Sequence, residues 1–392
     1  MKVDLSVEIA GIVLENPLIV ASGTPTRTAE HIIKCYEAGA AGAVTKTITY
    51  AEIHRAQPKP RMHVIYPLNA IKGGYFSFYS IELMSEIEPE KWVNEIKKVK
   101  EKYPDRLLVA SIAGRSLEEW EKLARLVDEA GADAIELNLS CPHVEKEEFM
   151  GKAAAKKTDI IYNIVKTVKK AASIPVIGKL TPQGANPLEL AKTMHSARVD
   201  AVVSTARFQG LVLDLNSLEP ILWKSFGGYG GPWQVPISLA WTAHIALELP
   251  DLTVIGSGGI HSGKDAAAFI AVGASAFQVC TAVIVKSYSI IKQILKELAD
   301  WMTEKGYMKI EDFKGKALPK IKSLEELNRK KIYRIEVDEN KCSGCGICAE
   351  RCFYGAIIVK KGKPEINYNL CDNCGLCVAI CPNRALKIKK AH

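Results

Sequence analysis

The chain has 392 residues, of which 48% are hydrophobic and 24% charged, which is typical of a globular protein with a large domain and a small appendage. Its formal net charge of +8 comes from scattered lysines without the basic stripe and interleaved aromatics of a nucleic-acid groove, so we expect a solvated surface or an acidic protein partner such as a small electron carrier. No run reaches the roughly 18 apolar residues that span a bilayer, and residues 1–17 lack the apolar core of a signal peptide, so we expect a cytoplasmic protein without a membrane partner.

The apolar pattern predicts a barrel over residues 1–304. Residues 5–17 indicate a short hairpin at the bottom of this barrel, and strand-like runs then alternate with amphipathic helical runs such as 116–132. Eight strand–helix units favour a closed (β/α)8 TIM barrel over a doubly wound sheet. The predicted strands are residues 16–22, 42–48, 107–113, 133–140, 175–182, 200–206, 252–259 and 276–282.

Two segments are longer than ordinary connections, residues 49–104 after the second strand and residues 207–234 after the sixth. Both follow strands, so both belong to the C-terminal face of the barrel, where barrel enzymes do their chemistry. We therefore expect these two segments to shape a site.

Polar residues gather where the predicted strands end, on that same face. Ser257–Gly259 after the seventh strand, with Cys280 and Thr281 after the eighth, suit a phosphate, because glycines allow close approach and backbone N–H groups at helix starts face an anion. The other polar strand ends carry Ser22, Lys46, Thr47, Asn138, Ser140, Cys141, Lys179, Thr181, Ser204 and Thr205.

The C-terminal part of the chain contains an internal repeat. Residues 305–335 are charged and poorly periodic and indicate a linker, beyond which residues 337–359 and 366–388 repeat each other at a spacing of 29 residues. Each half carries the spacing C-x2-C-x2-C-x3-C of bacterial ferredoxins with two [4Fe–4S] clusters. The sequence therefore predicts a small α+β ferredoxin domain at 336–392.

The cysteine spacing also predicts how the clusters share their ligands. Three closely spaced thiolates cap one face of a cubane, and the fourth lies too far along the chain to reach it, so it ligates the other cluster. Zinc, the alternative, is usually held by two separated pairs of ligands. We expect one cluster on Cys342, Cys345, Cys348 and Cys381, and the other on Cys371, Cys374, Cys377 and Cys352.

The clusters predict a flavin in the barrel. Clusters pass single electrons, and a flavin converts single electrons into pairs, whereas a nicotinamide does not. We therefore expect the barrel to hold FMN or to pass electrons to a partner that does. Three further cysteines lie far apart, and we expect them to be thiols without disulfides: Cys35, Cys141 and Cys280.

A flavin gives the lysines and one thiol specific roles. Reduced flavin is negatively charged near N1 and O2, so Lys46 and Lys179 are predicted to stabilise it, with ion pairs at the barrel rim as the alternative. Cys141 is a candidate general acid and base, because a thiol titrates near about 8.5, while a plain buried thiol is the alternative. His143 either tunes Cys141 or lies in a surface loop, and Cys35 is expected in the core.

Five short motifs lie at the ends of predicted strands: "VTKT" at 44–47, "ELNLSCPH" at 136–143, "GKLTP" at 178–182, "GSGGI" at 256–260 and "QVCTA" at 278–282. They resemble a known family, the dihydropyrimidine dehydrogenases with their FMN-binding barrel, and the related class 1 dihydroorotate dehydrogenases. The stretch "FSFYSIELMSE" at 76–86 and the trailing two-cluster module favour the first, in particular a bacterial subunit made of an FMN barrel plus a ferredoxin domain. The resemblance covers nearly the whole chain.

The resemblance implies roles for the residues at the barrel mouth. Cys141 donates a proton to one carbon of a C=C bond, FMN N5 delivers hydride to the other, and Asn138, Leu139 and Ser140 face the substrate. Electrons arrive through the clusters, and the ferredoxin domain of one subunit can serve the barrel of its mate. A homodimer is therefore expected, beside a FAD subunit that uses NAD(P)H or a ferredoxin. FMN is held by Ser22, Lys46, Thr47, Lys179, Ser257, Gly258, Gly259, Cys280 and Thr281.

The chain departs from the family where the substrate is recognised. Ala206 and Arg207 replace an Asn–Thr pair that binds the pyrimidine, Ser80 replaces another asparagine, and the loop at 231–235, where a family glycine contacts the FMN phosphate, is shorter. The missing amides put pyrimidine recognition in doubt. Arg207 either clamps a carboxylate as part of the substrate site or points to solvent.

Together these features predict an FMN- and iron–sulfur-dependent oxidoreductase that interconverts a C=C bond and its saturated form next to a carbonyl. Dihydropyrimidines are the default substrate, with a related cyclic imide or an unsaturated acid as alternatives. Dihydroorotate oxidation is the second choice, because that site also needs the missing amide. The alternative of another class is a non-catalytic electron-transfer subunit whose barrel is a docking scaffold.

Overall fold

The computed structural model describes residues 3–72, 74–141, 143, 148–329 and 333–390. The chain divides into two compact units, residues 1–320 and 321–392. In the part of the chain that the structure describes, no helix is long and apolar enough to cross a bilayer.

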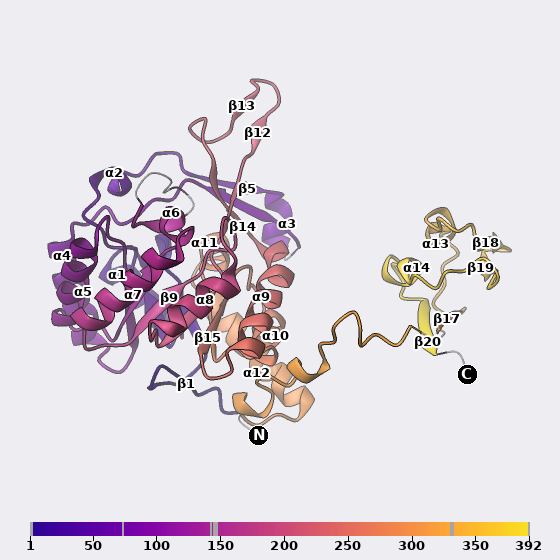
Figure 1. Ribbon diagram of the computed structural model, residues 1–392. Coiled ribbons are helices and arrows are strands. Elements are labelled where there is room, and N and C mark those ends of the chain that lie inside the picture. The colour runs from indigo at the N-terminus through magenta and orange to yellow at the C-terminus, as the bar shows by residue number, and fades with distance from the viewer. Residues whose placement is uncertain (1–2, 73, 142, 144–147, 330–332, 391–392) are drawn as a thin grey trace. The chain divides into compact units, whose positions relative to one another are not determined.

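The first unit is built around a closed barrel of eight parallel strands (Figure 1). The strands follow one another around the barrel in chain order, and the eighth pairs with the first, with Phe277 opposite Leu18. This closure confirms the predicted TIM barrel and excludes a doubly wound sheet, whose edges remain open. The barrel strands are β3 (Leu18–Val20), β4 (Gly42–Val44), β7 (Leu107–Ile112), β8 (Ala134–Asn138), β9 (Val176–Lys179), β10 (Ala201–Ser204), β15 (Thr253–Ser257) and β16 (Ala276–Val279).

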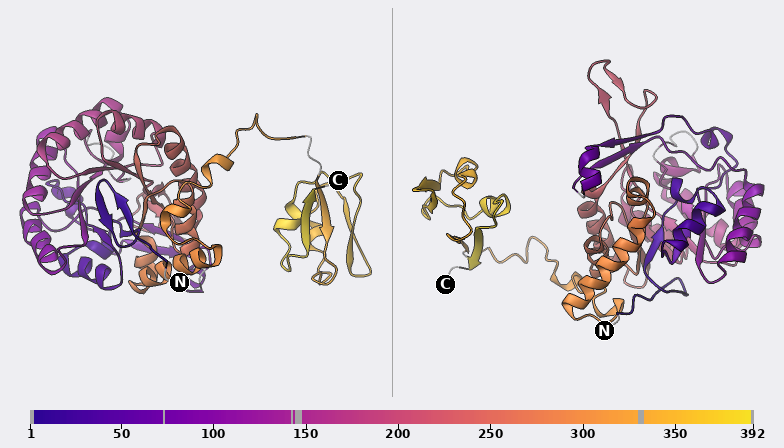
Figure 2. Two further views of the ribbon diagram at one scale, coloured as in Figure 1. Left: turned by 90° about the horizontal axis from the view of Figure 1, so that it is seen from below. Right: turned by 180° about the vertical axis from the view of Figure 1, so that it is seen from behind.

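Helices surround the barrel and alternate with its strands (Figure 2). Four of them begin after a residue whose side-chain oxygen accepts a backbone N–H of the first turn: Thr28, Ser116, Asn186 and Ser262. The outer helices are α1 (Ala29–Glu37), α4 (Pro89–Lys102), α5 (Leu117–Glu129), α7 (Thr158–Ala171), α8 (Pro187–Ser196), α9 (Val235–Glu248), α10 (Gly263–Ala271) and α12 (Ser289–Lys305).

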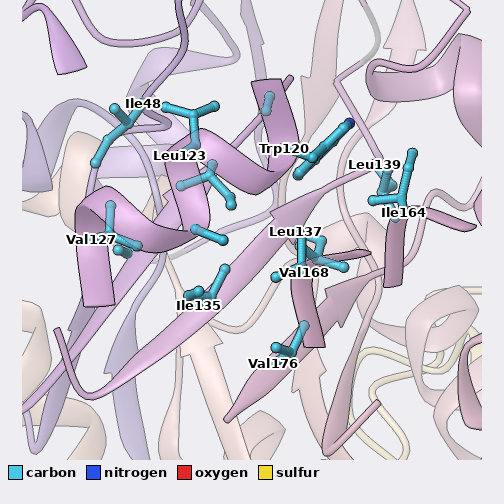
Figure 3. Packing of buried hydrophobic residues seen from close by; sticks show 14 of the residues in the cluster. Ile48, Trp120, Leu123, Val127, Ile135, Leu137, Leu139, Ile164, Val168 and Val176 are labelled. Atoms are coloured by element: carbon cyan, nitrogen blue, oxygen red, sulfur yellow. The ribbon is translucent and has the colours of Figure 1, made fainter. Parts of the chain in front are cut away.

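The main core lies between the strands and this ring of helices, and it decides which side chains point into the barrel. Figure 3 shows Trp120 and Leu123 of α5 near Ile135 and Leu137 of β8. Side chains alternate along a strand, so Glu136 of the same strand points the other way, into the barrel. The apolar pattern of β8 therefore aims its polar residues at the barrel interior.

A short hairpin closes the bottom of the barrel. It consists of β1 (Val7–Ile9) and β2 (Ile12–Leu14), paired antiparallel with Val7 opposite Leu14. Seen from below in Figure 2, it lies across the end of the barrel, as predicted from the sequence. The site is therefore left at the opposite end.

The two long insertions form a cover at that opposite end. They supply one antiparallel sheet in the order β11-β14-β6-β5, and the hairpin of β12 and β13 protrudes above it (Figure 1). The elements of this face are α2 (Glu52–Arg55), β5 (Met62–Ile65), α3 (Pro67–Lys72), β6 (Ser77–Ser80), α6 (Gly151–Ala155), β11 (Phe208–Gly210), β12 (Leu213–Asp214), β13 (Glu219–Pro220), β14 (Gly227–Gly230) and α11 (Thr281–Lys286).

The segment 305–335, expected to be a linker, divides at the boundary between the units. Ile310 and Phe313 are buried with the barrel core, and the Gly315 N–H donates to the Ile270 carbonyl of α10. Residues 305–320 therefore belong to the barrel unit, because their two large apolar side chains bury against its helices.

The second unit is a small α+β fold in which the two halves of the repeat exchange strands. The strand after one cysteine run pairs with the strand before the other, as β18 does with β19, and the outermost strands β17 and β20 also pair. Its elements are β17 (Tyr333–Val337), α13 (Ile347–Glu350), β18 (Ile357–Lys360), β19 (Lys363–Ile366), α14 (Leu376–Ala379) and β20 (Leu386–Lys390).

Candidate active site

A cavity lies at the C-terminal end of the barrel, between the strand ends and the cover. We call it the mouth cavity. Residues predicted separately from seven strand ends are thus brought together in one space. The predicted site residues that line it are Ser22, Lys46, Thr47, Asn138, Ser140, Cys141, Lys179, Arg207, Ser257, Gly258, Gly259, Cys280 and Thr281.

Leu139 was predicted to face the substrate, and this prediction is wrong for its side chain. Leu139 is fully buried in the core between β8 and the outer helices (Figure 3). In the extended segment that follows β8, neighbouring side chains point to opposite sides, so Asn138 and Ser140 face the mouth cavity and Leu139 cannot.

Thr47 connects the polar residues on the β3, β4 and β8 side of the mouth cavity. Its hydroxyl lies 3.3 Å from the Ser22 hydroxyl and 3.0 Å from the Ser111 hydroxyl, and it accepts a hydrogen bond of 2.9 Å from the Asn138 amide. The Asn138 carbonyl oxygen in turn accepts from the Ser140 hydroxyl at 3.3 Å. This chain of hydrogen bonds fixes the orientation of the Asn138 amide at the cavity wall.

Lys46 is buried and forms an ion pair with Glu82. Glu82 lies just after β6, within the insertion between β4 and β7. The Lys46 ammonium donates to the Glu82 carboxylate at 2.8 Å, and the Thr24 hydroxyl donates to the same oxygen at 2.7 Å. Burial alone raises the pKa of Glu82, but the positive charges of Lys46 and Arg207 and these hydrogen bonds outweigh it and lower the pKa to about 2. Glu82 is therefore ionised, and Lys46 has a permanent partner in the cavity wall.

Lys179 belongs to a second buried polar group, which lies deeper in the barrel. Its ammonium donates to Glu136 at 3.2 Å and to the Gln278 side-chain oxygen at 2.8 Å, and the Gln278 amide donates to Glu136 at 2.7 Å. The three side chains come from β9, β8 and β16, and Glu136 is fully buried. Both predicted lysines are thus paired inside the cavity wall and not at an exposed rim.

The glycine turn after β15 offers backbone donors to an anion. Gly258 and Gly259 have φ angles of 107° and 86°, and within the described residues neither N–H has an acceptor. A Cβ at Gly258 would lie 2.4 Å from Gln234 Nε2, and one at Gly259 would lie 2.7 Å from the Gly231 carbonyl oxygen. Only glycine fits this turn, which lines the mouth cavity and can offer its N–H groups to an anion there.

The three cysteines of the barrel lie in different environments. Cys141 is largely buried but lines the mouth cavity beside Asn138 and Ser140, whereas Cys35 is buried in α1. Burial, with a smaller contribution from the Glu82 charge, raises the pKa of the Cys280 thiol to about 12. A Cβ at Gly23 would lie 2.4 Å from the Cys280 sulfur, so this thiol packs on backbone and stays protonated.

His143 does not lie on an open surface. Its Nε2 atom is buried and has no hydrogen-bond partner among the described residues. Burial, followed by the positive charges of Arg207 and Lys46, lowers the pKa of His143 to about 3, so the ring is neutral. Because Arg207 and Lys46 line the mouth cavity and their charges act on His143, the His143 ring lies near this cavity.

Sequence reasoning missed three buried partners, Glu82, Glu136 and Gln278. Glu136 and Gln278 are polar residues inside apolar strands, which is a signal for inward-facing functional positions, and the signal was available. Glu82 lies outside regular secondary structure and gives no such signal. The cover also contributes Phe76, Phe78 and Gln234 to the cavity wall.

The second unit contains two separate cavities lined by cysteines. The distribution of cysteines follows the exchange predicted from the spacing, in which each cavity takes three from one half of the repeat and one from the other. Among the described residues, all eleven cysteines of the chain are without disulfides. One cavity is lined by Cys342, Cys345, Cys348 and Cys381, and the other by Cys352, Cys371, Cys374 and Cys377.

The loops around these cavities need left-handed backbone. Gly344 has a φ of 72°, and a Cβ there would lie 2.5 Å from the Gly362 carbonyl oxygen. Asn373, at the equivalent position of the second half, has a φ of 58°, which asparagine tolerates better than most residues. The turns thus keep each cysteine run close around its cavity.

Comparison with known proteins matches both units. A family model described as dihydroorotate dehydrogenase matches residues 4–302, and one described as a 4Fe-4S dicluster domain matches residues 341–386. The chain is 30% identical over 359 residues to the NAD-dependent dihydropyrimidine dehydrogenase subunit PreA of Escherichia coli, with 90% of this chain and 86% of the relative covered.

Two further relatives are named for a dihydroorotate dehydrogenase and for a dihydropyrimidine dehydrogenase. The chain is 35% identical over 316 residues to the catalytic subunit of dihydroorotate dehydrogenase B (NAD(+)) of Pyrococcus abyssi, covering 80% of this chain and 99% of the relative. It is 27% identical over 371 residues to the chloroplastic dihydropyrimidine dehydrogenase (NADP(+)) of Arabidopsis thaliana, covering 91% and 87%.

Proposed function

This chain belongs to the dihydroorotate dehydrogenase family, and we propose that it interconverts a C=C bond next to a carbonyl with the saturated form of that bond. It is a flavin-dependent oxidoreductase acting on CH–CH bonds, and its family binds FMN. The dicluster domain carries two [4Fe–4S] clusters, with eight cysteines between residues 342 and 381.

One observation supports this proposal above the others: the residues suited to hold FMN and the thiol suited to move a proton line a single cavity. The N–H groups of Gly258 and Gly259 suit the phosphate, and Lys46 and Lys179 suit the electron-rich edge of the ring. Ser22, Thr47, Cys280 and Thr281 also line this cavity.

FMN, when bound, supplies or accepts a hydride and exchanges single electrons with the clusters. The residues of this chain supply the rest. Asn138 and Ser140, oriented through Thr47, bind the polar edge of the substrate. Cys141 gives a proton to the substrate carbon, or takes one from it, at its sulfur atom. Cys280, whose pKa is raised to about 12, is unsuited to that step.

The substrate that we propose first is a dihydropyrimidine, and the second is dihydroorotate. Both follow from what the relatives' names say of those proteins. A related cyclic imide or unsaturated acid is the third, because Ser80, Ala206 and Arg207 stand where the family binds a pyrimidine with amides.

We also propose partners for this chain from the names of its relatives. The Escherichia coli and Pyrococcus relatives are named as subunits, so this chain is expected to work in a complex. We propose a homodimer in which one ferredoxin domain serves the barrel of its mate. A FAD subunit that uses NAD(P)H, or a ferredoxin, would be the external electron partner in the cytoplasm.

The absorption spectrum of the purified full-length chain tests the proposal first. Flavin bands together with the broad cluster absorption are expected, followed by bleaching of the flavin under anaerobic conditions when a dihydropyrimidine or dihydroorotate is added. Clusters without flavin would support the alternative of a non-catalytic electron-transfer subunit. Flavin that none of the saturated compounds bleaches would contradict the proposed reaction.

A further inference from the structure

Arg207 lines the mouth cavity, and two strands of the cover hold its side chain. Its Nη1 donates a hydrogen bond of 2.6 Å to the Ser80 hydroxyl on β6. A Cβ at Gly228 of β14 would lie 2.6 Å from Arg207 Cζ, so the guanidinium packs directly against that glycine. The small residues Ser80 and Gly228 therefore provide the space in which Arg207 lies, and it does not simply extend into solvent.

The guanidinium has unused donor capacity. Arginine carries five N–H donors, and within the described residues the hydrogen bond to Ser80 is the single one that the Arg207 side chain makes. The same residues form no ion pair with it. A planar group with free donors at a cavity wall suits a carboxylate, which it can bind through two parallel hydrogen bonds.

Among the charged residues of the mouth cavity that the structure describes, none is a counterion of Arg207. Lys46 is neutralised by Glu82 at 2.8 Å and Lys179 by Glu136 at 3.2 Å. His143, near enough for the Arg207 charge to act on it, is neutral because its pKa is lowered to about 3, by burial first and then by the charges of Arg207 and Lys46. Within the described part of the chain one positive charge thus remains in the cavity, and a cavity of this kind favours an anionic ligand.

The FMN phosphate does not account for this charge. The donors suited to the phosphate are the N–H groups of Gly258 and Gly259, at the end of β15. Arg207 instead acts electrostatically on Glu82 and His143, and it is held by β6 and β14 of the cover. Arg207 is therefore positioned by the cover, in the same cavity as Cys141 and Asn138.

We propose that Arg207 binds a carboxylate of the substrate, and that this contact selects the acids among the candidate substrates, dihydroorotate or an unsaturated acid, over the neutral dihydropyrimidine that the relatives' names put first. The inference rests on the proposed function, because it names the charge of the substrate used at the same site. Ser80 is the positioning residue that orients the guanidinium. With a neutral ring in this cavity the half-buried guanidinium would have no counterion among the described residues, whereas an acid would supply one.

Ligand binding tests the proposal independently of turnover. The full-length protein with FMN and clusters is titrated with orotate and with uracil, which share a ring and differ by the carboxylate, and with open-chain unsaturated acids and their primary amides. The readout is the shift of the flavin absorption bands. We expect acids to bind at least 10-fold more tightly than their neutral counterparts.

Three variants assign the preference to Arg207. Arg207→Gln is expected to weaken acid binding by about 10- to 100-fold and to leave neutral compounds and FMN content unchanged, and Arg207→Lys to retain part of the preference. Arg125→Gln, which removes an exposed arginine paired with Glu121 on α5, is the matched control and should bind like the parent protein.

Several outcomes would overturn the proposal: equal binding of acids and amides, no band shift with any acid, or loss of FMN in Arg207→Gln, which would make Arg207 a cofactor residue. Failure of the proposed function is distinguishable. Acids that shift the flavin bands through Arg207, while their saturated forms never bleach the flavin, would leave the carboxylate site standing and remove the reaction.

Discussion

The Lys46 ammonium donates a hydrogen bond of 2.8 Å to the Glu82 carboxylate inside the mouth cavity, joining the end of β4 to the insertion that covers the barrel. Their side chains are only 10% and 5% exposed. The pair therefore anchors the cover to the strand ends, and it places a fixed charge arrangement next to the proposed FMN site.

The Lys46–Glu82 pair predicts a specific pH dependence of stability. Folding lowers the pKa of Glu82 from an ordinary 4.5 to about 2, so its contribution is complete above pH 4.5 and is lost as pH falls toward 2. At pH 7, Glu82→Gln is expected to lower the free energy of unfolding by about 3 kcal/mol, because it leaves Lys46 buried without a partner.

Urea denaturation of both proteins at several pH values measures this effect, and the difference between them should shrink between pH 4.5 and 2. Both proteins contain the same clusters, so the contribution of the clusters cancels in the difference between the two free energies of unfolding. Asp300→Asn, which breaks an exposed pair with Lys296 on α12, should cost less than about 1 kcal/mol. A difference at pH 7 no larger than in that control would contradict the buried pair.

Gly258→Ala is predicted to expel FMN while the barrel stays folded. The added Cβ would lie 2.4 Å from Gln234 Nε2 and Ser238 Oγ, which forces the glycine turn to move. Flavin content per protein after gel filtration is the measurement. Gly11→Ala, at a φ of 82° with nothing within 4 Å, imposes the same kind of backbone strain away from the site, and it should keep full flavin.

The exchange of cysteines between the halves of the repeat predicts which pairs of variants act on one cluster. Cys352→Ser and Cys371→Ser should each remove about half of the iron, and the double variant should remove no more than either alone, since both line one cavity. Cys352→Ser combined with Cys342→Ser should remove nearly all of it. Iron analysis and low-temperature EPR distinguish this from ligation within each half, which predicts the opposite pattern.

Much of this arrangement follows from local sequence patterns. Eight apolar runs and a repeat of 29 residues define the barrel and the ferredoxin fold, because strand periodicity and cluster spacing are short-range signals. Local patterns do not show which distant side chains pair with each other. Lys46 and Glu82 are 36 residues apart, and Gln278 and Glu136 are 142 apart, so only the closed barrel shows that they meet.

Leu139 and residues 305–320 show two further limits of prediction from the sequence. A family motif places Leu139 in a substrate-facing stretch, but the alternation of side chains turns it into the core. Residues 305–320 look like a linker because their charges dominate the composition, while the two large residues that dock them, Ile310 and Phe313, are too few to give a periodic signal.

Proton transfer at Cys141 is tested most directly by the rate of anaerobic flavin bleaching in Cys141→Ala. We predict that this variant keeps its FMN, its clusters and its ligand-induced band shifts, and that bleaching by the saturated substrate slows by about 100-fold or more, because removing a positioned acid or base costs that much. Cys35→Ala, which truncates a buried thiol of α1 outside the cavity, should bleach at the parent rate. Bleaching by Cys141→Ala at an unchanged rate would contradict the proton-transfer role on which the proposed reaction depends.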